Sequence, residues 1–222
     1  MKQVFLDPSQ QVVIKVFENS RQLEREFCGV RAFSRVCLTP EIEKLDLKVA
    51  RISLLDGFLG YQIIEGDLNK LVADHLIKTA KLDMIACSCS IFETISNLEV
   101  DFLDNPQILM RLKKIKKAIL NIDLMPVHGD LQKQNIIIRE GKIGLIDFEH
   151  FLFAPKELEI VNSLYFNDGN CLDITAISKI LPQGFFDQKI LKLMMEFYAI
   201  KQLSLKNQLL NQKINYKIEE SL

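Results

Sequence analysis

Hydrophobic residues near the start of the chain are spaced as in β-strands. Apolar residues dominate "QVFLDPSQQVVIKVF" (3–17) on both sides of Asp7-Pro8-Ser9, a group of turn residues, so this stretch predicts a hairpin. A second hairpin is predicted where "LKVARISLL" (47–55) and "FLGYQIIEG" (58–66) flank Asp56-Gly57, since Asp-Gly is a strong two-residue turn signal. Two hairpins in succession predict an antiparallel sheet.

Between these hairpins the spacing of apolar residues changes to that of a helix. Asn19-Ser20 is a natural helix start, and Leu23, Phe27 and Val30 then recur at helical spacing. The pattern predicts an amphipathic helix over residues 20–34, which we expect to pack on the sheet.

Beyond residue 66 the pattern is mostly helical. Helix-breaking residues stand near Lys78-Thr79 and at Asp104-Asn105-Pro106. One pair of short strands is predicted at Ile136–Arg139 and in "IGLIDF" (143–148), joined by a turn at Glu140-Gly141-Lys142.

Together these patterns predict an α+β fold in two lobes. Residues 1–66 form a small antiparallel β lobe with one helix, and residues 67–222 form a larger helical lobe with one hairpin. The chain has 222 residues, of which 48% are hydrophobic, so it has enough apolar material to bury a core.

The charges of the chain are nearly balanced, with 28 Lys and Arg against 29 Asp and Glu, which argues against nucleic acid or an anionic membrane as a partner. We interpret the five cations of "RLKKIKKAIL" (111–120) as the solvated face of a helix with an apolar stripe. No apolar run approaches the roughly 20 residues that span a bilayer, and the chain begins without a secretory signal, so we expect a cytoplasmic protein with no membrane span. Nothing in the sequence specifies an oligomeric state.

The cysteines number five, and none of them form a Cys-x-x-Cys pair. Their odd number and apolar neighbours favour reduced core thiols over a zinc site or a disulfide framework. They are Cys28, Cys37, Cys87, Cys89 and Cys171.

The stretch "VHGDLQKQNIII" (127–138) carries the candidate chemistry. Asp130 and Asn135 flank a loop, and Asp147 follows the strand that pairs with the one after Asn135. The hairpin between those strands brings Asp147 back beside Asn135, because antiparallel strands joined by a tight turn lie side by side. Three oxygen-bearing side chains should therefore converge.

Phosphoryl transfer uses such an arrangement. Mg²⁺ prefers hard oxygen ligands and usually keeps several waters, so Asn135 and Asp147 together with nucleotide phosphates suffice to hold it. A separate carboxylate must orient the attacking hydroxyl and accept its proton, and Asp130 suits that task. The alternative is that these residues are ordinary turn and cap residues, which Asp and Asn also favour.

The order and spacing of these residues resemble the aminoglycoside phosphotransferase and choline kinase superfamily, a group of protein-kinase-like phosphotransferases. The matching residues are His128-Gly129-Asp130, then Asn135, then Ile146-Asp147-Phe148-Glu149. The resemblance implies ATP and Mg²⁺ as cofactors, and a nucleotide and a hydroxyl-bearing acceptor as binding partners, with Asp130 as catalytic base.

The same resemblance implies a nucleotide site in the small lobe. Lys15 in "VVIKVF" corresponds to the strand lysine that holds nucleotide phosphates, and Glu26 on the following helix is its preferred carboxylate partner, with Glu24 as the alternative. Backbone groups from Ile64 to Gly66 correspond to the hinge that meets the adenine ring.

Two further residues have supporting roles by this resemblance. Glu159, rather than Glu157, is the candidate that braces the catalytic loop, although an acidic residue at the start of a helix is also favoured by the helix dipole. His128 is interpreted as a histidine that hydrogen-bonds to the backbone of the loop rather than as a proton shuttle.

The chain departs from the superfamily pattern at three places. No glycine precedes Val12, so the glycine-rich phosphate loop is absent, shortened or replaced by the Asp7-Pro8-Ser9 turn. Gly129 stands where regulated kinases carry an arginine that senses phosphorylation, and Glu149 replaces the glycine of Asp-Phe-Gly, so we expect a constitutive site. Only 75 residues follow Asp147, which predicts an open acceptor pocket.

Four functions fit the sequence to different degrees. The leading one is an ATP- and Mg²⁺-dependent phosphotransferase acting on a hydroxyl of a small metabolite, sugar or antibiotic. The others are a protein or glycan kinase of the same fold, a non-catalytic nucleotide-binding pseudokinase, and a metal-dependent hydrolase built on His128, Asp130, Asp147 and His150. The motifs that accompany such hydrolases are missing.

Overall fold

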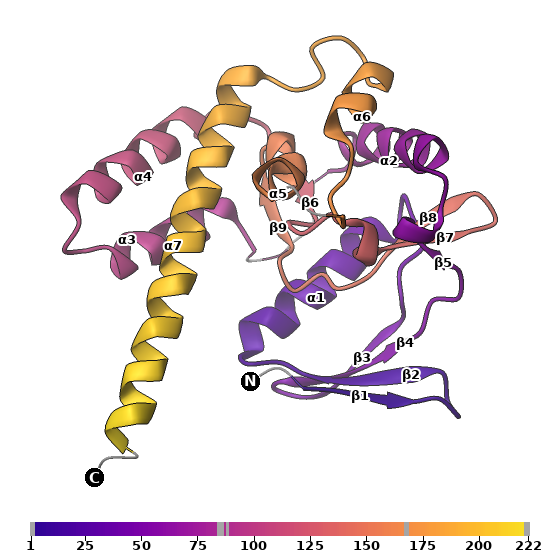
Figure 1. Cartoon of the computed structure of the whole chain (residues 1–222), viewed down its shortest axis with the longest axis horizontal. Coiled ribbons are helices and arrows are strands. Elements are labelled where there is room, and N and C mark those ends of the chain that lie inside the picture. Colours follow the sequence, from indigo (N-terminus) through magenta and orange to yellow (C-terminus); the bar gives the residue numbers. More distant parts are fainter. Residues whose placement is uncertain (1–2, 84–86, 88, 167–168, 220–222) are drawn as a thin grey trace.

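The computed structural model describes residues 3–83, 87, 89–166 and 169–219, and it has the predicted α+β fold with a small β-rich lobe and a larger helical lobe (Figure 1). In Figure 1 the sheet of the small lobe lies at the lower right, helix α1 runs diagonally above it, most helices of the large lobe lie in the upper part, and α7 runs down the left side.

The small lobe is a four-stranded antiparallel sheet in the order β1-β2-β4-β3. Its strands are β1 (Gln3–Asp7), β2 (Val12–Val16), β3 (Ile42–Asp46) and β4 (Val49–Ser53). The first predicted hairpin is confirmed: the Asp7 carboxylate accepts hydrogen bonds from the backbone and hydroxyl of Ser9 at 3.1 and 2.6 Å, which fixes the turn between β1 and β2.

Helix α1 (Ser20–Phe33) confirms the helix predicted over residues 20–34. Its first turn is capped by Asn19, whose side chain accepts a hydrogen bond from the backbone of Gln22 at 3.0 Å. Leu23, Val30 and other residues of one face are buried, so the helix packs by its apolar side as the spacing indicates.

The second predicted hairpin is wrong. Strand β4 pairs with β3 through a turn at residues 47–48, whereas β5 (Phe58–Leu59) crosses to the large lobe and pairs with β7 (Ile136–Arg139). Strand β7 pairs along this edge with β5. Gly57, with a φ of +151°, lets the chain approach β7 closely, because a Cβ added there would lie 2.6 Å from the Ile138 carbonyl oxygen. Tertiary pairing therefore overrides the local turn signal.

Helices make up most of the large lobe. They are α2 (Glu65–Thr79), α3 (Ile91–Asp101), α4 (Pro106–Ile119), α5 (Val161–Tyr165), α6 (Ile174–Ile180) and α7 (Gln188–Glu219), with 3₁₀ turns η1 (Gly60–Gln62), η2 (Lys133–Asn135) and η3 (Lys156–Ile160). Two small antiparallel pairings hold its centre, one between β6 (Met125–Val127) and β9 (Leu152–Ala154) and one between β7 and β8 (Lys142–Leu145).

The predicted hairpin between β7 and β8 is confirmed. Glu140 and Gly141 at its tip both have positive φ, 52° and 71°, as two-residue hairpin turns require. Strand β8 ends at Leu145, earlier than "IGLIDF" predicts, so Asp147 lies in the segment after the strand.

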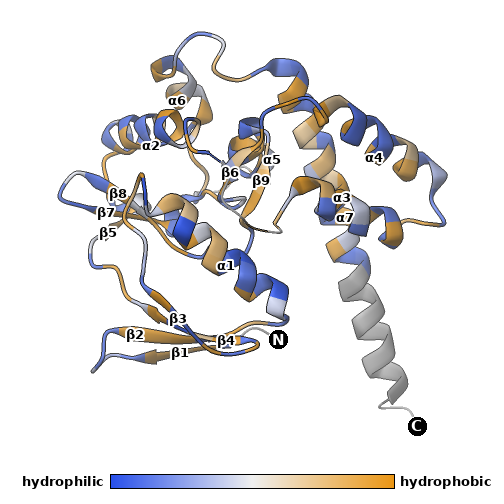
Figure 2. Ribbon diagram, turned by 180° about the vertical axis from the view of Figure 1, so that it is seen from behind, coloured by the Kyte–Doolittle hydropathy of each residue, from blue (hydrophilic) through white to orange (hydrophobic). Residues whose placement is uncertain are grey.

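Two large clusters of buried hydrophobic residues hold the molecule together. One packs α1 and α2 against the β7–β8 hairpin, and the other packs α3, α4 and α7 around β6 and β9. The apolar stripe of α4, formed by Leu112, Ile115 and Ile119, is fully buried in the second cluster, as predicted from its spacing. In Figure 2 strands β6 and β9 at the centre are hydrophobic, and helices such as α2 and α4 carry both hydrophobic and hydrophilic residues.

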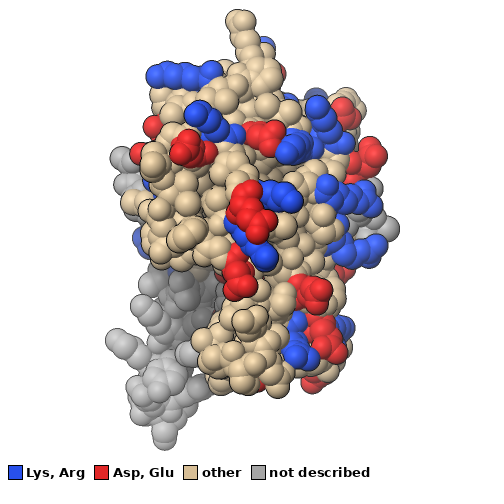
Figure 3. Space-filling view, turned by 90° about the vertical axis from the view of Figure 1, so that its right-hand side faces the viewer, with Lys and Arg blue, Asp and Glu red and all other residues tan. Residues whose placement is uncertain are grey.

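The surface carries charges of both signs. On the face shown in Figure 3, Lys and Arg side chains are interspersed with Asp and Glu and form no broad patch of one sign. Within the described part of the chain, every helix is too short or too polar to cross a bilayer.

Candidate active site

Lys15 lies at the centre of a network of charged side chains between the lobes. It sits on β2, opposite Ala50 of β4, and its side chain is buried. Its Nζ lies 3.0 Å from Glu26 Oε2 on α1, 2.5 Å from Asp147 Oδ1 and 3.7 Å from Glu149 Oε2. Lys15 therefore joins the sheet, the helix and the segment after β8.

This network keeps the lysine charged. Burial disfavours the ammonium form of Lys15, but attraction from Glu26 and Asp147 outweighs it and raises its pKa above the ordinary value. Glu26 is buried and makes the contact, whereas Glu24, the alternative partner, is exposed.

Asp147 is held in an unusual backbone conformation beside Asn135. Its φ is +66°, a left-handed value that is uncommon for residues with a side chain and occurs often at functional sites. The Ile146 amide donates to the Asn135 carbonyl at 3.1 Å, and His128 Nε2 hydrogen-bonds to the Ile146 carbonyl at 2.9 Å. The β7–β8 hairpin therefore brings Ile146, the residue before Asp147, back to Asn135, and His128 contacts the loop backbone as interpreted.

The Asp130 carboxylate accepts hydrogen bonds from three side-chain amides. Asn135 donates to Oδ2 at 3.0 Å, Gln132 donates to Oδ1 at 2.9 Å, and Asn162 of α5 also donates to Oδ1. Burial raises the pKa of Asp130, and the bond from Asn135 opposes that change. The carboxylate is therefore fixed in orientation and is a better proton acceptor than an exposed aspartate.

Asn135 has one more function in this geometry. Its Nδ2 is used by Asp130, donating also to the Asp130 backbone carbonyl at 2.9 Å, so its carbonyl oxygen is the atom left to meet a cation. Together with the half-exposed carboxylate of Asp147 it makes a pair of hard oxygen donors, which fits Mg²⁺.

Glu159 contacts the backbone of the loop that carries Asp130. Its Oε2 accepts a hydrogen bond from the Gly129 amide at 3.2 Å, and burial raises its pKa to about 7. Gly129 has a φ of +79°, and an added Cβ would collide with the His150 carbonyl oxygen. The backbone conformation and the close approach of His150 therefore both require glycine at position 129, where regulated kinases carry an arginine.

The expected hinge lies at the start of α2. Ile64 is the residue before the helix, and its carbonyl accepts bonds from the Asp67 and Leu68 amides at 3.0 and 3.1 Å. That carbonyl is thus engaged by the helix, while Gly66 lies in the first turn and is exposed. Contact of Ile64 and Gly66 with a nucleotide stays a prediction.

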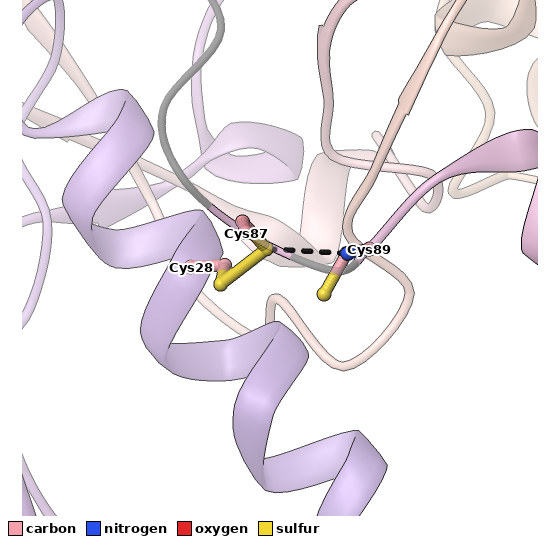
Figure 4. Close-up of side chains that lie close together, drawn as sticks. All are labelled: Cys28, Cys87 and Cys89. Atoms are coloured by element: carbon pink, nitrogen blue, oxygen red, sulfur yellow. Dashed lines mark hydrogen bonds between the residues drawn. A yellow bond between two sulfur atoms is a disulfide. The ribbon is translucent and has the colours of Figure 1, made fainter.

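The expectation of reduced cysteines is wrong for one pair. Cys28 of α1 and Cys87 of the segment after α2 form a disulfide, and Cys89 lies beside them, its amide donating to Cys87 Sγ at 3.3 Å (Figure 4). These residues are 59 positions apart, so only the packing of α1 against that segment reveals the pairing. Cys37, Cys89 and Cys171 are not part of this disulfide and remain reduced.

Some site residues had no distinct signal in the sequence. Asn162 stands in a short helix far from the loop it contacts, and Gln132 lies inside the loop without matching any motif position. Glu149 was noted as a departure from Asp-Phe-Gly, but its approach to Lys15 follows only from the fold.

The chain has the two-lobed kinase-like fold. A buried lysine on a strand of the small lobe pairs with a glutamate on the following helix, and it faces a loop that carries an Asp and an Asn and a second aspartate after the next strand. Solved aminoglycoside phosphotransferases share this fold. The gentamicin complex of APH(2'')-IIa superimposes with a TM-score of 0.64 at 17% identity over 97% of this chain and 85% of that chain. ADP-bound APH(2'')-Ib gives a TM-score of 0.61 at 18% identity over 91% of this chain and 82% of that chain. The GDP complex of aminoglycoside 2'-phosphotransferase-IIIa gives a TM-score of 0.68 at 13% identity over 98% of this chain and 87% of that chain.

No protein-family model and no curated protein matches the sequence. Because the sequences of these solved structures are 13–18% identical to this chain, their structural similarity establishes its fold.

Proposed function

We propose that this protein is an ATP- and Mg²⁺-dependent phosphotransferase that moves the γ-phosphoryl group to a hydroxyl of a small molecule. The observation that carries the proposal is the contact of Lys15 with both Glu26 and Asp147, with Asp130 and Asn135 hydrogen-bonded to each other nearby. Solved structures of the same fold contain ATP, ADP or GDP, which supports a nucleotide as the phosphoryl donor.

The small lobe binds the donor in this proposal. Lys15 turns its ammonium group to the nucleotide phosphates, and Glu26 fixes its position by the buried ion pair. Asp147 and Asn135 would hold Mg²⁺, which would supply neutralising charge for the phosphates. The backbone between Ile64 and Gly66 meets the base of the nucleotide.

Asp130 serves the acceptor. Its carboxylate orients the acceptor hydroxyl and takes its proton as the oxygen forms a bond to the γ-phosphorus, while the bond from that phosphorus to the leaving oxygen breaks and ADP is released. The three amide donors hold Asp130 in one rotamer, so little reorganisation is needed during the reaction.

The experiment compares wild type, Asp130→Asn and the control Asp123→Asn, an exposed aspartate upstream of the loop. ATP with Mg²⁺ should raise the melting temperature of all three, because a ligand that binds only the native state stabilises it. ADP release across a panel of hydroxyl compounds should fall by about 10²–10⁴-fold in Asp130→Asn alone, the usual contribution of a positioned base. Equal rates for Asp130→Asn and wild type would refute the assigned base.

A non-catalytic nucleotide-binding role is the second candidate, and one observation favours it. No glycine precedes the strand of Lys15, and the turn between β1 and β2 is closed on itself by Asp7, which accepts bonds from Ser9 and Gln10, so a glycine-rich phosphate loop is missing from this part of the chain. A thermal shift with ATP and Mg²⁺ without ADP release from any acceptor would establish this role instead.

A further inference from the structure

Two cations from opposite ends of the chain lie together beside the catalytic loop. Arg25 of α1 and Lys201 of α7 line a small cavity whose other walls include Gly129 and His150. The remaining lining residues are Thr94, Leu152, Leu158, Phe197 and Tyr198. The lining therefore holds two cationic side chains and no carboxylate.

Neither cation has a carboxylate partner among the described residues. The Arg25 guanidinium donates one hydrogen bond, to Thr94 Oγ1 at 3.3 Å, and its Nε is buried without an acceptor in the described part of the chain. Within that same part, no acidic side chain lies in ion-pair distance of Lys201 Nζ. Both side chains are half-buried, and charged groups withdrawn from water are ordinarily paired, so two neighbouring cations without a carboxylate partner are unusual.

The pKa values of both cations are shifted downward. Burial and then Arg25 lower the pKa of Lys201 to about 8. Burial and then Arg21 lower the pKa of Arg25, while attraction to Cys89, Glu93 and Glu24 opposes that change. Asp130 attracts Lys201 but is already bonded to three amides. An anion between Arg25 and Lys201 would relieve their repulsion.

The cavity adjoins the reacting groups. Gly129 immediately precedes Asp130, and Lys201 and Asp130 lie close enough for each to affect the pKa of the other. The enclosed space is about 10 Å³, which corresponds to one water-sized sphere. An oxygen of a carboxylate or phosphate has that size, and the Tyr198 hydroxyl is a further polar group in the wall.

We propose that the acceptor carries a carboxylate or phosphate group, one oxygen of which binds between Arg25 and Lys201 while the acceptor hydroxyl meets Asp130. This inference rests on the phosphotransferase function proposed above and narrows its substrate class to anionic hydroxyl compounds. The two cations also offset the repulsion between such an acceptor and the γ-phosphate of the nucleotide. Polycationic aminoglycosides, which the solved structures of this fold contain, do not match two unpaired cations at this place.

Matched acceptors test the proposal with the full chain. Initial rates of ADP release are measured with glucose, glucose 6-phosphate, glucuronate and kanamycin. We expect the anionic sugars to have a KM at least tenfold below that of glucose, and kanamycin to be the poorest acceptor. Equal use of glucose and both anionic sugars, or preference for kanamycin, would overturn the proposal.

Variants then assign the effect to the two cations. Lys201→Gln and Arg25→Gln should raise the KM for the anionic acceptor at least tenfold while the KM for ATP stays within about twofold of wild type. The control Lys206→Gln, an exposed lysine further along α7, should match wild type. A KM for the anionic acceptor that is the same in Lys201→Gln and Lys206→Gln would contradict the assignment.

A separate measurement distinguishes this proposal from the function on which it rests. Inorganic phosphate without nucleotide should raise the melting temperature of wild type and Lys206→Gln but not of Lys201→Gln. If phosphate does so while no acceptor supports ADP release, the phosphotransferase function fails and the site binds a free anion only, which overturns the acceptor assignment. If ADP release occurs but phosphate acts equally on all variants, the anion site alone is refuted.

Discussion

Gly29 of α1 packs directly against Phe148, the residue after Asp147. A Cβ added at position 29 would lie 2.5 Å from Phe148 Cβ and 2.7 Å from two ring carbons. The helix that carries Glu26 therefore approaches the proposed metal-binding segment as closely as it does because position 29 has no side chain.

Gly29→Ala should consequently weaken the fold. Overpacking of a filled core costs about 1–3 kcal/mol, and we expect that loss in the free energy of unfolding measured by urea denaturation. Gly169→Ala is the matched control, since an added Cβ there meets nothing within 4 Å. Equal stability of the two variants would show that α1 shifts without cost.

Glu26→Gln should weaken nucleotide binding. The variant loses the charged partner of Lys15, and hydrogen bonds between charged groups contribute about 1.5–3 kcal/mol, so the KM for ATP should rise about tenfold or more. Glu24→Gln, an exposed neighbour on the same helix, should leave it unchanged. A larger effect of Glu24→Gln would mean that the helix presents the other glutamate in solution.

Asn162→Ala should lower kcat without changing the KM for ATP. Asn162 donates to Asp130 Oδ1 and does not contact the Lys15 network, so its loss leaves the base less well oriented. A single hydrogen bond worth about 1.4 kcal/mol corresponds to roughly a tenfold decrease in rate. Steady-state kinetics with saturating acceptor measures this split, and an unchanged kcat would count against a positioning role.

Glu159 should make stability depend on pH. Its pKa in the folded chain, about 7, lies above the ordinary value of 4.5, so the folded state binds the proton more tightly than the unfolded state. The stabilisation from this group is complete below about pH 4.5 and is lost as the pH rises to about 7. The difference in unfolding free energy between wild type and Glu159→Gln, measured from pH 4 to 8, should therefore fall over that interval. A constant difference would show that Glu159 titrates normally.

Reduction of the Cys28–Cys87 disulfide should destabilise the chain. The bond closes a loop of 59 residues, for which loop entropy predicts about 4 kcal/mol of stabilisation. Guanidinium denaturation with and without dithiothreitol measures this loss. Cys28→Ser should show the same loss and no response to the reductant; equal stability of wild type in both conditions would mean that the pair is not bonded.

Local sequence signals were enough to predict α1, the first hairpin and the arrangement of Asp130, Asn135 and Asp147, because in each case turn, cap and strand residues lie within a few positions of one another. Features that depend on distant packing were not predictable. The segment after Asp56-Gly57 pairs with β7 instead of forming the local hairpin that the turn signal predicts. Cys28 and Cys87 come together only through the packing of α1.

The proposed acceptor site depends most strongly on packing between residues that are distant in the sequence. Arg25 and Lys201 are 176 positions apart, and Asn162 is 32 positions from the carboxylate it holds. None of the three belongs to a motif, and each side chain type is common on a helix surface. Their proximity to Asp130 becomes apparent only when α1, α5 and α7 are placed around the loop that carries it.

The sulfur bridge between Cys28 and Cys87 gives the molecule a second covalent attachment between its lobes, in addition to the backbone that runs from β4 to α2. Reduction of the Cys28–Cys87 bond leaves the backbone between β4 and α2 as the covalent connection between the lobes, so their relative placement then depends on noncovalent packing of α1 against α2 and the β7–β8 hairpin.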